Sequence, residues 1–341
     1  MFYKKLIYAV LFLAILSCNG RDRKVHPAFY YWKTILSGNN AENALLQAIA
    51  GEYLYVRFFD IDLDMTSGQP VPVGILKAQR LTLDSQKIIP VVYITQKCLL
   101  RLSSHDVPAL ARRMVELVQD MCTRYAIGPE EIQLDCDWTR TTRNLYFALL
   151  QELKQQPFLT GRKLSCTIRM HQVKYVSQSG VPPVDRGMLM CYNMGNMKKY
   201  GGHNSILETQ EAKAYMRDME QYPLRLDIAL PLFHWAVLFA DHRFKGIAYD
   251  MLPGDFNNDE LVQVKDNLYR FTKDTENKGY FFKQGEEIRF EQSRQSELED
   301  IARYAGRHIN NNDFRVAFFH LDSTSVNDFS PGDINRILKA F

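Results

Sequence analysis

Carboxylate side chains stand at the end of a short apolar run in this sequence of 341 residues. The run Leu134-Asp135-Cys136-Asp137-Trp138 places two carboxylates two residues apart, on the same side of an extended chain. Two neighbouring carboxyl groups can share acid and base or nucleophile roles, because burial and nearby charges move their pKa values apart. We therefore predict Asp137, together with Asp135, as the first candidates for catalysis.

Other apolar runs also end in polar or aromatic residues that would complete a site around Asp137. The predicted partner carboxylate is Asp322, with Asp60 and Asp250 as alternatives. A histidine can tune or replace a carboxylic acid, and basic or aromatic side chains bind polar groups and ring faces of a ligand. The predicted substrate-binding residues are Arg57, Arg169, His171, Tyr192, Asn193, His234, Trp235 and His320.

A purely structural role is the alternative for some of these charges. Buried charge is costly unless it is paired, so Asp135 could form an internal ion pair with Arg57 or Arg169 that only holds the fold together. Asp137 lies one step nearer the end of its run, where a side chain reaches a ligand. We favour a functional role for Asp137 and leave both roles open for Asp135.

The elements that must position these residues alternate between short apolar runs and amphipathic segments. The clearest helix is predicted over Val107–Tyr125, where apolar residues recur about every 3.6 positions. Strands that alternate with helices indicate a parallel sheet, and strands apolar on both faces indicate burial on both sides. The predicted strands are Ala28–Lys33, Tyr53–Asp60, Ile88–Thr95, Glu131–Trp138, Lys163–His171, Met188–Met194, Leu226–Trp235 and Phe314–Asp322.

These strands and helices predict an α/β fold, a closed (β/α)8 TIM barrel. An α+β insert is predicted between the last two barrel strands, at about residues 240–312, with a helix near Asp259–Thr272. Residues 61–86 are predicted to form a long connection with a short helix. The site of such a barrel lies at the C-terminal ends of its strands, which is where the polar residues stand. No glycine-rich phosphate-binding motif is present, so no cofactor is predicted.

The cysteines are predicted to pack behind the site rather than to act in it. On their strands, Cys136, Cys166 and Cys191 alternate with the polar residues and would face the helices as small hydrophobic side chains. The sequence has no C-x-x-C spacing, which excludes a zinc cluster and a small disulfide scaffold. The candidate histidines come from three different strands without H-x-H or H-E-x-x-H spacing, so no metal site is predicted.

The start of the sequence indicates export. Lys4 and Lys5 precede an uninterrupted apolar run over residues 6–16, which is too short to span a membrane but typical of a signal peptide. Residues 15–18 (ILSC) resemble the bacterial lipobox, in which the cysteine, here Cys18, becomes the lipid-modified N-terminus. A plain signal peptide with an incidental cysteine is the alternative.

This interpretation divides the chain into a signal peptide (1–17), a lipidated tether (18–26) and a single barrel domain (27–341). The expected location is a bacterial cell envelope, with a lipid anchor in the outer membrane. Loss of Lys4 and Lys5 with the signal peptide lowers the formal charge from +3 to +1. No basic stripe remains for nucleic acid, so nucleic-acid binding is not expected.

Two strand ends together resemble the family-18 chitinase-type glycoside hydrolases. Residues 132–139 (IQLDCDWT) are similar to that family's fourth-strand motif D-x-x-D-x-D-x-E, and residues 190–193 (MCYN) to its sixth-strand M-x-Y-D. The resemblance covers the barrel and implies a protein that acts on glycans. It places Asp137 at the Asp that orients the acetamido group of the substrate. The chain also resembles exported barrel lipoproteins of Bacteroidetes type.

The sequence departs from the family pattern at three positions. The general acid Glu falls on Thr139, which cannot donate a proton at neutral pH. The leading Asp falls on Ile132, and the sixth-strand Asp on Asn193. Family-18 enzymes use the acetamido oxygen as the nucleophile and need both an Asp and a Glu, so the resemblance implies a site without its acid.

Three functions stay open. In the first, the chain is a glycoside hydrolase with a rearranged pair of carboxyls, which would lie about 5–5.5 Å apart for retention or about 6.5–9.5 Å apart for inversion. In the second, it is a catalytically inactive, lectin-like barrel that binds a glycan. In the third, it is a structural envelope protein whose insert offers the apolar run around Phe281 and Phe282 to a partner, unless that run packs on the barrel as a hairpin.

Overall fold

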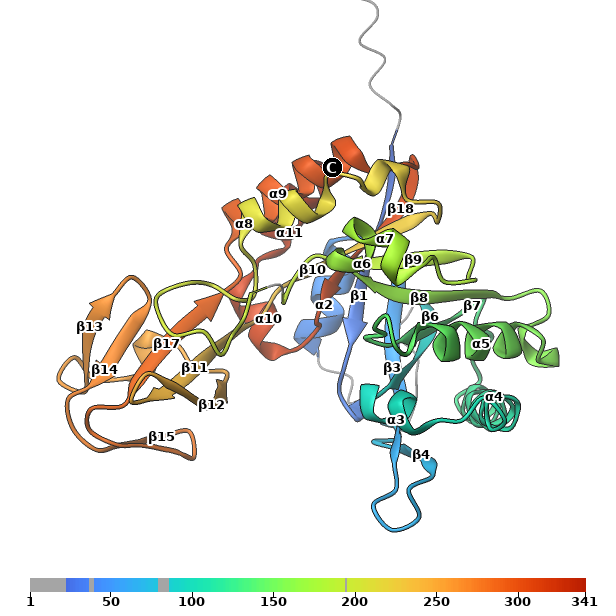
Figure 1. The fold of residues 1–341 in the computed structure, drawn as a ribbon. Coiled ribbons are helices and arrows are strands. Elements are labelled where there is room, and N and C mark those ends of the chain that lie inside the picture. The colour runs from blue at the N-terminus through green and yellow to red at the C-terminus, as the bar shows by residue number, and fades with distance from the viewer. Residues whose placement is uncertain (1–22, 37–39, 79–85, 194) are drawn as a thin grey trace, which may run out of the picture.

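Eight parallel strands close into a barrel in a computed structural model that describes residues 23–36, 40–78, 86–193 and 195–341 (Figure 1). Hydrogen bonding runs in the order β1-β18-β10-β9-β8-β7-β6-β3, and β1 also pairs with β3, which completes the circle. The predicted (β/α)8 barrel is therefore confirmed. Its strands are β1 (Lys24–Tyr31), β3 (Tyr53–Leu63), β6 (Lys87–Ile94), β7 (Glu131–Asp135), β8 (Lys163–Arg169), β9 (Arg186–Met190), β10 (Leu226–Pro231) and β18 (Asp313–Phe319).

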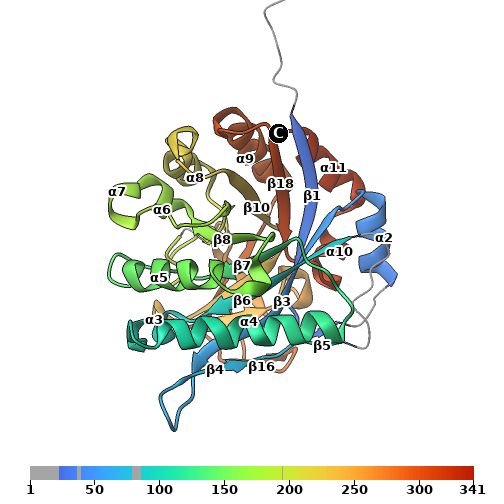
Figure 2. The same ribbon diagram turned by 90° about the vertical axis from the view of Figure 1, so that its right-hand side faces the viewer.

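The barrel strands are apolar on both faces because each face has its own core. The inner core is small and includes Tyr30, Tyr55 and Met190, whereas the outer core packs the strands against the helices. Figure 2 shows these helices arranged around the barrel. They are α2 (Asn40–Ala48), α3 (Gln96–Arg101), α4 (Val107–Arg124), α5 (Arg143–Lys154), α6 (Met170–Lys174), α7 (Val176–Ser179), α8 (Thr209–Met216), α9 (Gln295–His308), α10 (Ser323–Asp328) and α11 (Pro331–Lys339), with 3-10 turns at Pro157–Leu159, Met219–Gln221 and Pro253–Asp255.

The cysteines lie where strand alternation predicts them. Cys136, Cys166 and Cys191 all belong to the outer core, and the Cys191 Sγ lies 4.0 Å from the Met216 Sδ of α8. Every described cysteine is buried and free of disulfides. Burial raises the pKa of the Cys136 thiol well above its usual value. These thiols therefore pack as small hydrophobic groups. The predicted lipid attachment residue, Cys18, lies outside the described residues.

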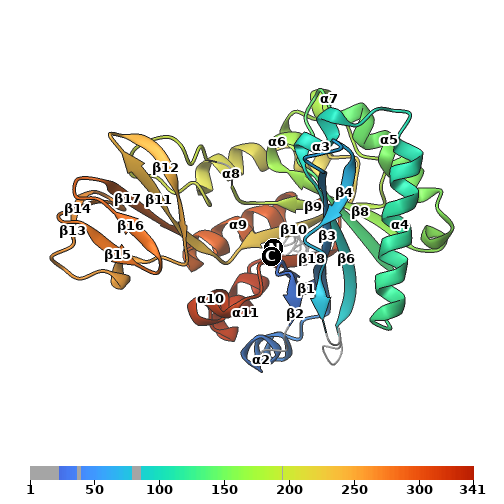
Figure 3. The same ribbon diagram turned by 90° about the horizontal axis from the view of Figure 1, so that it is seen from below.

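A separate antiparallel sheet is inserted between β10 and β18. It has five strands in the order β12-β11-β17-β14-β13, and Figures 1 and 3 show it set to one side of the barrel. A two-stranded hairpin packs against it through a third apolar core, which contains Phe271, Phe282 and Phe290. The strands are β11 (His234–Ala240), β12 (Arg243–Tyr249), β13 (Leu261–Lys265), β14 (Leu268–Phe271), β15 (Thr275–Asn277), β16 (Tyr280–Phe282) and β17 (Glu287–Gln292).

One predicted helix is wrong, and a second has no counterpart in the described residues. The helix predicted near Asp259–Thr272 is instead the hairpin of β13 and β14, which turns at Asp266, where φ is +49°. The short helix predicted within residues 61–86 is absent from the described part of that segment. There β3 continues to Leu63 and pairs with β4 (Pro70–Val73), and β5 (Lys77–Ala78) pairs with β2 (Ile35–Leu36). In both places, short apolar runs have the composition of either element, and their partner strands decide between them.

Several barrel strands are shorter than predicted at their C-terminal ends. β8 stops at Arg169, so His171 belongs to α6, and β9 stops at Met190. The seventh barrel strand ends at Pro231, and the chain then crosses into the insert sheet at His234. None of the helices among the described residues is long and apolar enough to cross a membrane.

Candidate functional site

An ion pair occupies the C-terminal mouth of the barrel. Asp137 follows β7 and Arg169 ends β8, the neighbouring strand. The Arg169 Nε and Nη2 donate hydrogen bonds of 2.5 and 3.0 Å to the two carboxylate oxygens of Asp137. The side chains are 23% and 44% exposed, so the pair is only partly shielded from solvent. Parallel strands end at the same edge of the barrel, which is why the two predicted residues meet here.

Asp135 lies one layer deeper than this pair and is buried. The Thr167 hydroxyl of β8 donates a 2.6 Å hydrogen bond to the Asp135 Oδ1. Burial is the largest effect and raises the pKa of Asp135 to about 6, although Thr167 and Arg169 act to lower it. Asp135 therefore carries a proton more readily near neutral pH than an ordinary carboxyl group does.

A third carboxylate approaches the same place from β3. Asp60 forms an ion pair with Arg57, whose Nε donates to the Asp60 Oδ1 over 2.6 Å. The negative charges of Asp135, Asp137 and Asp60 all act on Tyr93 at the end of β6, where burial first of all raises the tyrosine pKa to about 12. This side of the mouth therefore gathers three carboxylates and two arginines, and each arginine is already paired.

Two buried polar atoms beside the ion pair have no hydrogen-bond partner among the described residues. They are the Nη1 of Arg169 and the hydroxyl of Tyr192, which follows β9. Both residues line a small cavity of about 70 Å³ together with His171 and Asn193. An unpaired buried donor costs on the order of 1–3 kcal/mol, and a ligand or a water molecule that reaches it removes this cost.

Aromatic side chains form the floor of the mouth around Phe319, the last residue of β18. Its ring centroid lies 5.6 Å from that of Trp32, 5.5 Å from that of Tyr192 and 6.0 Å from that of Phe233. The Arg57 guanidinium lies 5.8 Å from the centre of the Trp32 ring. The sequence analysis missed Trp32, Phe233 and Phe319, although Trp32 directly follows the first strand and could have been found by the same rule as the other strand ends.

His320 and Asp322 come together on another side of the mouth. The His320 Nε2 lies 3.3 Å from the Asp322 Oδ2, and the His320 Nδ1 is buried without a partner among the described residues. Burial first of all lowers the pKa of His320, and Lys33 adds to this, while Asp322 and Asp250 act in the opposite direction. Asp322 therefore acts on His320.

Two of the predicted ligand-binding residues are engaged elsewhere. His234 is buried, and its Nδ1 lies 2.8 Å from the Asp328 Oδ2 of α10. The Trp235 Nε1 donates a 2.9 Å hydrogen bond to the Glu291 Oε2 within the insert sheet. Both residues lie on β11 rather than at the end of a barrel strand, because the chain leaves the barrel after Pro231.

Thr139, which the motif resemblance aligns with the family-18 general acid, is held by the hydroxyl groups of neighbouring threonines. The Thr139 Oγ1 lies 2.9 Å from the Thr141 Oγ1, and the Thr139 N–H donates to the Thr142 Oγ1 just before α5. This segment therefore begins a helix and supplies no acid. Across the described ranges, no three His, Cys, Asp or Glu side chains converge as a group that could hold a metal ion.

Solved chitinases and chitinase-like proteins share this fold. The C-terminal domain of a putative chitinase from Desulfitobacterium hafniense matches with a TM-score of 0.58 and 11% identity, over 93% of this chain and 99% of its own. A chitinase from Chromobacterium violaceum gives a TM-score of 0.51 and 12% identity, over 92% and 98%. The chitinase-like agglutinin from Robinia pseudoacacia gives 0.55 and 11%, over 92% and 98%.

The chain shares the barrel fold of these chitinases and chitinase-like proteins. No family model and no curated protein matches the sequence. At such low identities the structural likeness concerns the fold, and the residues at the mouth must decide what the barrel does.

Proposed function

We propose that the mouth of the barrel binds a glycan that contains N-acetylhexosamine, without hydrolysing it by the family-18 mechanism. The observation that carries this proposal is the pair of unpartnered buried atoms, Arg169 Nη1 and Tyr192 OH, beside Asp137. A guanidinium donor and a phenol can together bind the oxygen atoms of a sugar ring or its acetamido group. The Asp137 carboxylate holds the Arg169 guanidinium in a fixed orientation for this contact.

The aromatic floor supports a sugar ligand. Trp32 and Phe319 are only half-buried, and each contacts the inner aromatic residue Tyr30. Aromatic faces bury the apolar C–H face of a sugar ring, while the polar rim fixes its hydroxyl groups. The combination of an apolar floor with directional donors is that of a saccharide site.

The missing acid argues for binding rather than cleavage. Glycosidic cleavage normally requires a proton donor at the leaving oxygen, and Thr139 stands at the position of that donor in the family motif. Asp137 is neutralised by Arg169 through both of its oxygens. A mouth that lacks this proton donor fits a lectin, which binds a glycan without cleaving it. The chitinase-like agglutinin among the structural neighbours provides a precedent on the same fold.

Hydrolysis is the second candidate, because Asp135 retains a carboxyl group with a raised pKa. At a pKa of about 6, part of the Asp135 population is protonated near neutral pH and is an acid in the sense that glycoside hydrolysis needs. In this mechanism Asp135 would protonate the glycosidic oxygen as the bond to the anomeric carbon breaks, and Asp137 would stabilise the positive charge on the sugar. A water molecule would then add to the anomeric carbon and give its proton back to Asp135.

Isothermal titration calorimetry with the pentasaccharide of β-1,4-linked N-acetylglucosamine tests the binding proposal. One of the neighbours, a chitinase from Ostrinia furnacalis, was solved in complex with a saccharide of this class. We expect saturable binding to the wild-type chain and at least about tenfold weaker binding to Arg169→Met. Arg112→Met is the matched control, because Arg112 pairs with Glu116 on the exposed face of α4. Equal affinity of all three proteins would overturn the proposal.

Mass spectrometry of the same mixtures separates the two candidates. An intact pentasaccharide after long incubation supports binding alone, whereas shorter products that disappear with Asp135→Asn support hydrolysis.

We also propose that the chain is an exported lipoprotein anchored through Cys18. The support comes from the sequence of residues 4–18, which lie outside the described part of the structure. β1 begins at Lys24 and runs towards the mouth, so an anchor a few residues earlier would hold the barrel by its opposite end. Mass spectrometry of the mature protein tests this: a lipid-modified N-terminal Cys18 is expected, and any other mature N-terminus contradicts it.

A further inference from the structure

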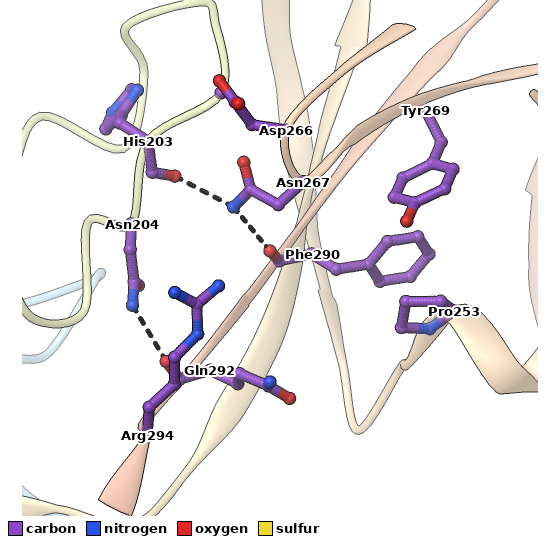
Figure 4. Close-up of a pocket in the computed structure, with 10 residues that line it drawn as sticks. His203, Asn204, Pro253, Asp266, Asn267, Tyr269, Phe290, Gln292 and Arg294 are labelled. Atoms are coloured by element: carbon purple, nitrogen blue, oxygen red, sulfur yellow. Dashed lines mark hydrogen bonds between the residues drawn. The ribbon is translucent and has the colours of Figure 1, made fainter. Parts of the chain in front are cut away.

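A second cavity lies at the insert sheet and shares none of its lining residues with the mouth. It has a volume of about 550 Å³, within the range of about 300–1,000 Å³ that is usual for small-molecule sites. Its walls come from the loop between β9 and α8, from the β13–β14 hairpin, and from β17 with the residues after it (Figure 4). Its main lining residues are Asn204, Pro253, Tyr269, Phe290, Gln292 and Arg294.

Side-chain amides tie the walls of this cavity together. The Asn267 Nδ2 donates to the main-chain oxygens of His203 and Phe290, over 3.2 and 2.7 Å. The Asn204 Nδ2 donates to the main-chain oxygen of Gln292 over 2.8 Å. Figure 4 shows these hydrogen bonds joining the loop to the sheet. The cavity is therefore a formed site whose walls have fixed positions.

A buried ion pair behind the cavity clamps the loop further. Arg289 and Glu291 have no exposed side-chain surface and form a 2.6 Å hydrogen bond. The Arg289 guanidinium also donates to the main-chain oxygens of Met197, Lys199 and Gly201. A site that is ordered before its ligand arrives loses less entropy on binding.

Glycine is required where the loop meets the β13–β14 turn. A Cβ atom at Gly202 would lie 2.9 Å from the Asp266 Cβ and 3.1 Å from the Lys265 oxygen. The loop and the β13–β14 turn therefore pack directly against each other at this side of the cavity.

The cavity has an apolar side and a polar side. Figure 4 shows Pro253, Tyr269 and Phe290 together on one side, opposite Asn204 and Arg294. The aromatic centroids of Tyr269 and Phe290 lie 5.5 Å apart in an edge-to-face contact.

The charges of the lining nearly cancel. Arg294 lies 3.6 Å from Glu297, and Asp266 contributes the one carboxylate of the lining. Burial, and then the charge of Arg289, lower the pKa of His203, which favours the neutral form of its ring. Such a lining selects a neutral ligand that has one apolar face and many hydroxyl groups.

We infer that this cavity is a second saccharide-binding site, for one or two units of a neutral sugar. The sugar ring packs on Phe290 and Tyr269, and its hydroxyl groups meet the side chains of Asn204, Gln292 and Arg294 from the polar side. The inference is independent of ligand binding at the mouth, because the two sites share no residue.

Titration of the ¹⁵N-labelled full chain by nuclear magnetic resonance tests this inference. The probes are the trisaccharide of N-acetylglucosamine, cellotriose and maltotriose, and the reporters are the side-chain amides of Asn204 and Gln292. We expect saturable shifts of these reporters with at least one probe. Tyr269→Ala should weaken that binding about tenfold, because it removes half of the aromatic wall.

Two control variants test whether the loss of saccharide binding is specific to the cavity. Val262→Thr, on an exposed position of β13 outside the cavity, should bind as the wild type does. Arg169→Met should also leave the cavity reporters unchanged, even where it abolishes binding at the mouth. The inference fails if none of the three probes gives saturable shifts, or if the shifts survive in Tyr269→Ala at unchanged affinity.

Discussion

The two ends of the barrel use the same ionic groups for different purposes. At the N-terminal end, Arg315 of β18 donates to the Glu131 carboxylate of β7 over 2.7 Å and to the Tyr55 hydroxyl over 2.8 Å. At the C-terminal end, Arg169 pairs with Asp137 over similar distances. The side chains of Arg315 and Glu131 are 3% and 0% exposed, whereas those of the mouth pair are much more open to solvent.

A neighbouring carboxylate at the N-terminal end, beside the Arg315–Glu131 pair, also has hydrogen-bond and ion-pair partners. Asp227 of β10 accepts a hydrogen bond from the Arg315 main chain over 2.8 Å and lies 3.3 Å from the Arg186 Nη1. This end seals the barrel. The mouth leaves Arg169 Nη1, Tyr192 OH and His320 Nδ1 without partners among the described residues, and the sealed end leaves Glu131 Oε1. The two ends therefore differ in solvent exposure and in the number of unpartnered polar atoms rather than in residue type.

The largest expected effect on stability comes from removing the Arg315–Glu131 ion pair at the N-terminal end of the barrel. Arg315→Met leaves Glu131 buried without its cation and should lower the free energy of unfolding by about 3–5 kcal/mol. Arg169→Met removes a partly exposed pair and should cost no more than about 1 kcal/mol. Urea denaturation of both variants measures the difference. Equal losses would show that the two pairs have the same structural role.

A pair of tyrosine variants sharpens the comparison. Tyr55→Phe removes the hydroxyl that accepts from Arg315 and should destabilise the fold by about 1.5–3 kcal/mol, because the lost hydrogen bond involves a charged group. Tyr192→Phe removes a hydroxyl without a described partner and should leave stability unchanged while weakening glycan binding about tenfold. Denaturation and calorimetry on the same preparations check both. A Tyr192→Phe variant that loses stability but keeps its affinity would reverse the assignment.

The pH dependence of stability reports on the buried carboxyl of the mouth. Burial raises the pKa of Asp135 to about 6 in the folded chain, above its value in the unfolded chain, so the native state binds the proton more tightly. Its contribution to stability is therefore present below about pH 4 and is lost as pH rises through about 6, by about 1.4 kcal/mol per pKa unit. Asp135→Asn should flatten this part of the stability profile.

Asp227 provides the comparison for that measurement at the other end of the barrel. Burial also raises its pKa to about 6, although Arg186 and Arg315 act to lower it, so Asp227→Asn should flatten the same part of the profile. Asp227→Asn also removes the carboxylate that lies 3.3 Å from the Arg186 Nη1 and should therefore lower stability at pH 7 more than Asp135→Asn does. Chemical denaturation between pH 4 and 8 decides this, and identical profiles for the two variants would contradict it.

The smallest expected effect concerns His320. Asp322 lies 3.3 Å from its Nε2 and raises the pKa of the ring, so Asp322→Asn should lower that pKa further. Titration of the ring resonances by nuclear magnetic resonance measures the shift. Asp328→Asn, which removes the partner of His234 instead, is the control and should leave the His320 titration unchanged.

The sequence predicted the barrel and the centre of the mouth because both depend on local periodicity. Alternation along β7 and β8 puts Asp137 and Arg169 on neighbouring strand ends, and a parallel barrel brings such ends together. The same alternation placed Cys136 and Cys166 behind the strands.

The sequence could not predict features that depend on distant partners. The seventh strand reads as one apolar run to Trp235, but the chain changes sheets after Pro231 because β17 offers a partner strand some sixty residues later. The Arg315–Glu131 pair joins residues 184 positions apart, and nothing local marks it. The hairpin of β13 and β14 is fixed by β17 in the same way.

A crystal structure of the full chain with the N-acetylglucosamine pentasaccharide tests the central claim most directly. The account predicts an intact saccharide across the mouth, with oxygen atoms within about 3 Å of the Arg169 Nη1 and the Tyr192 hydroxyl. A saccharide bound only elsewhere on the molecule, or cleaved products in the mouth, would contradict it.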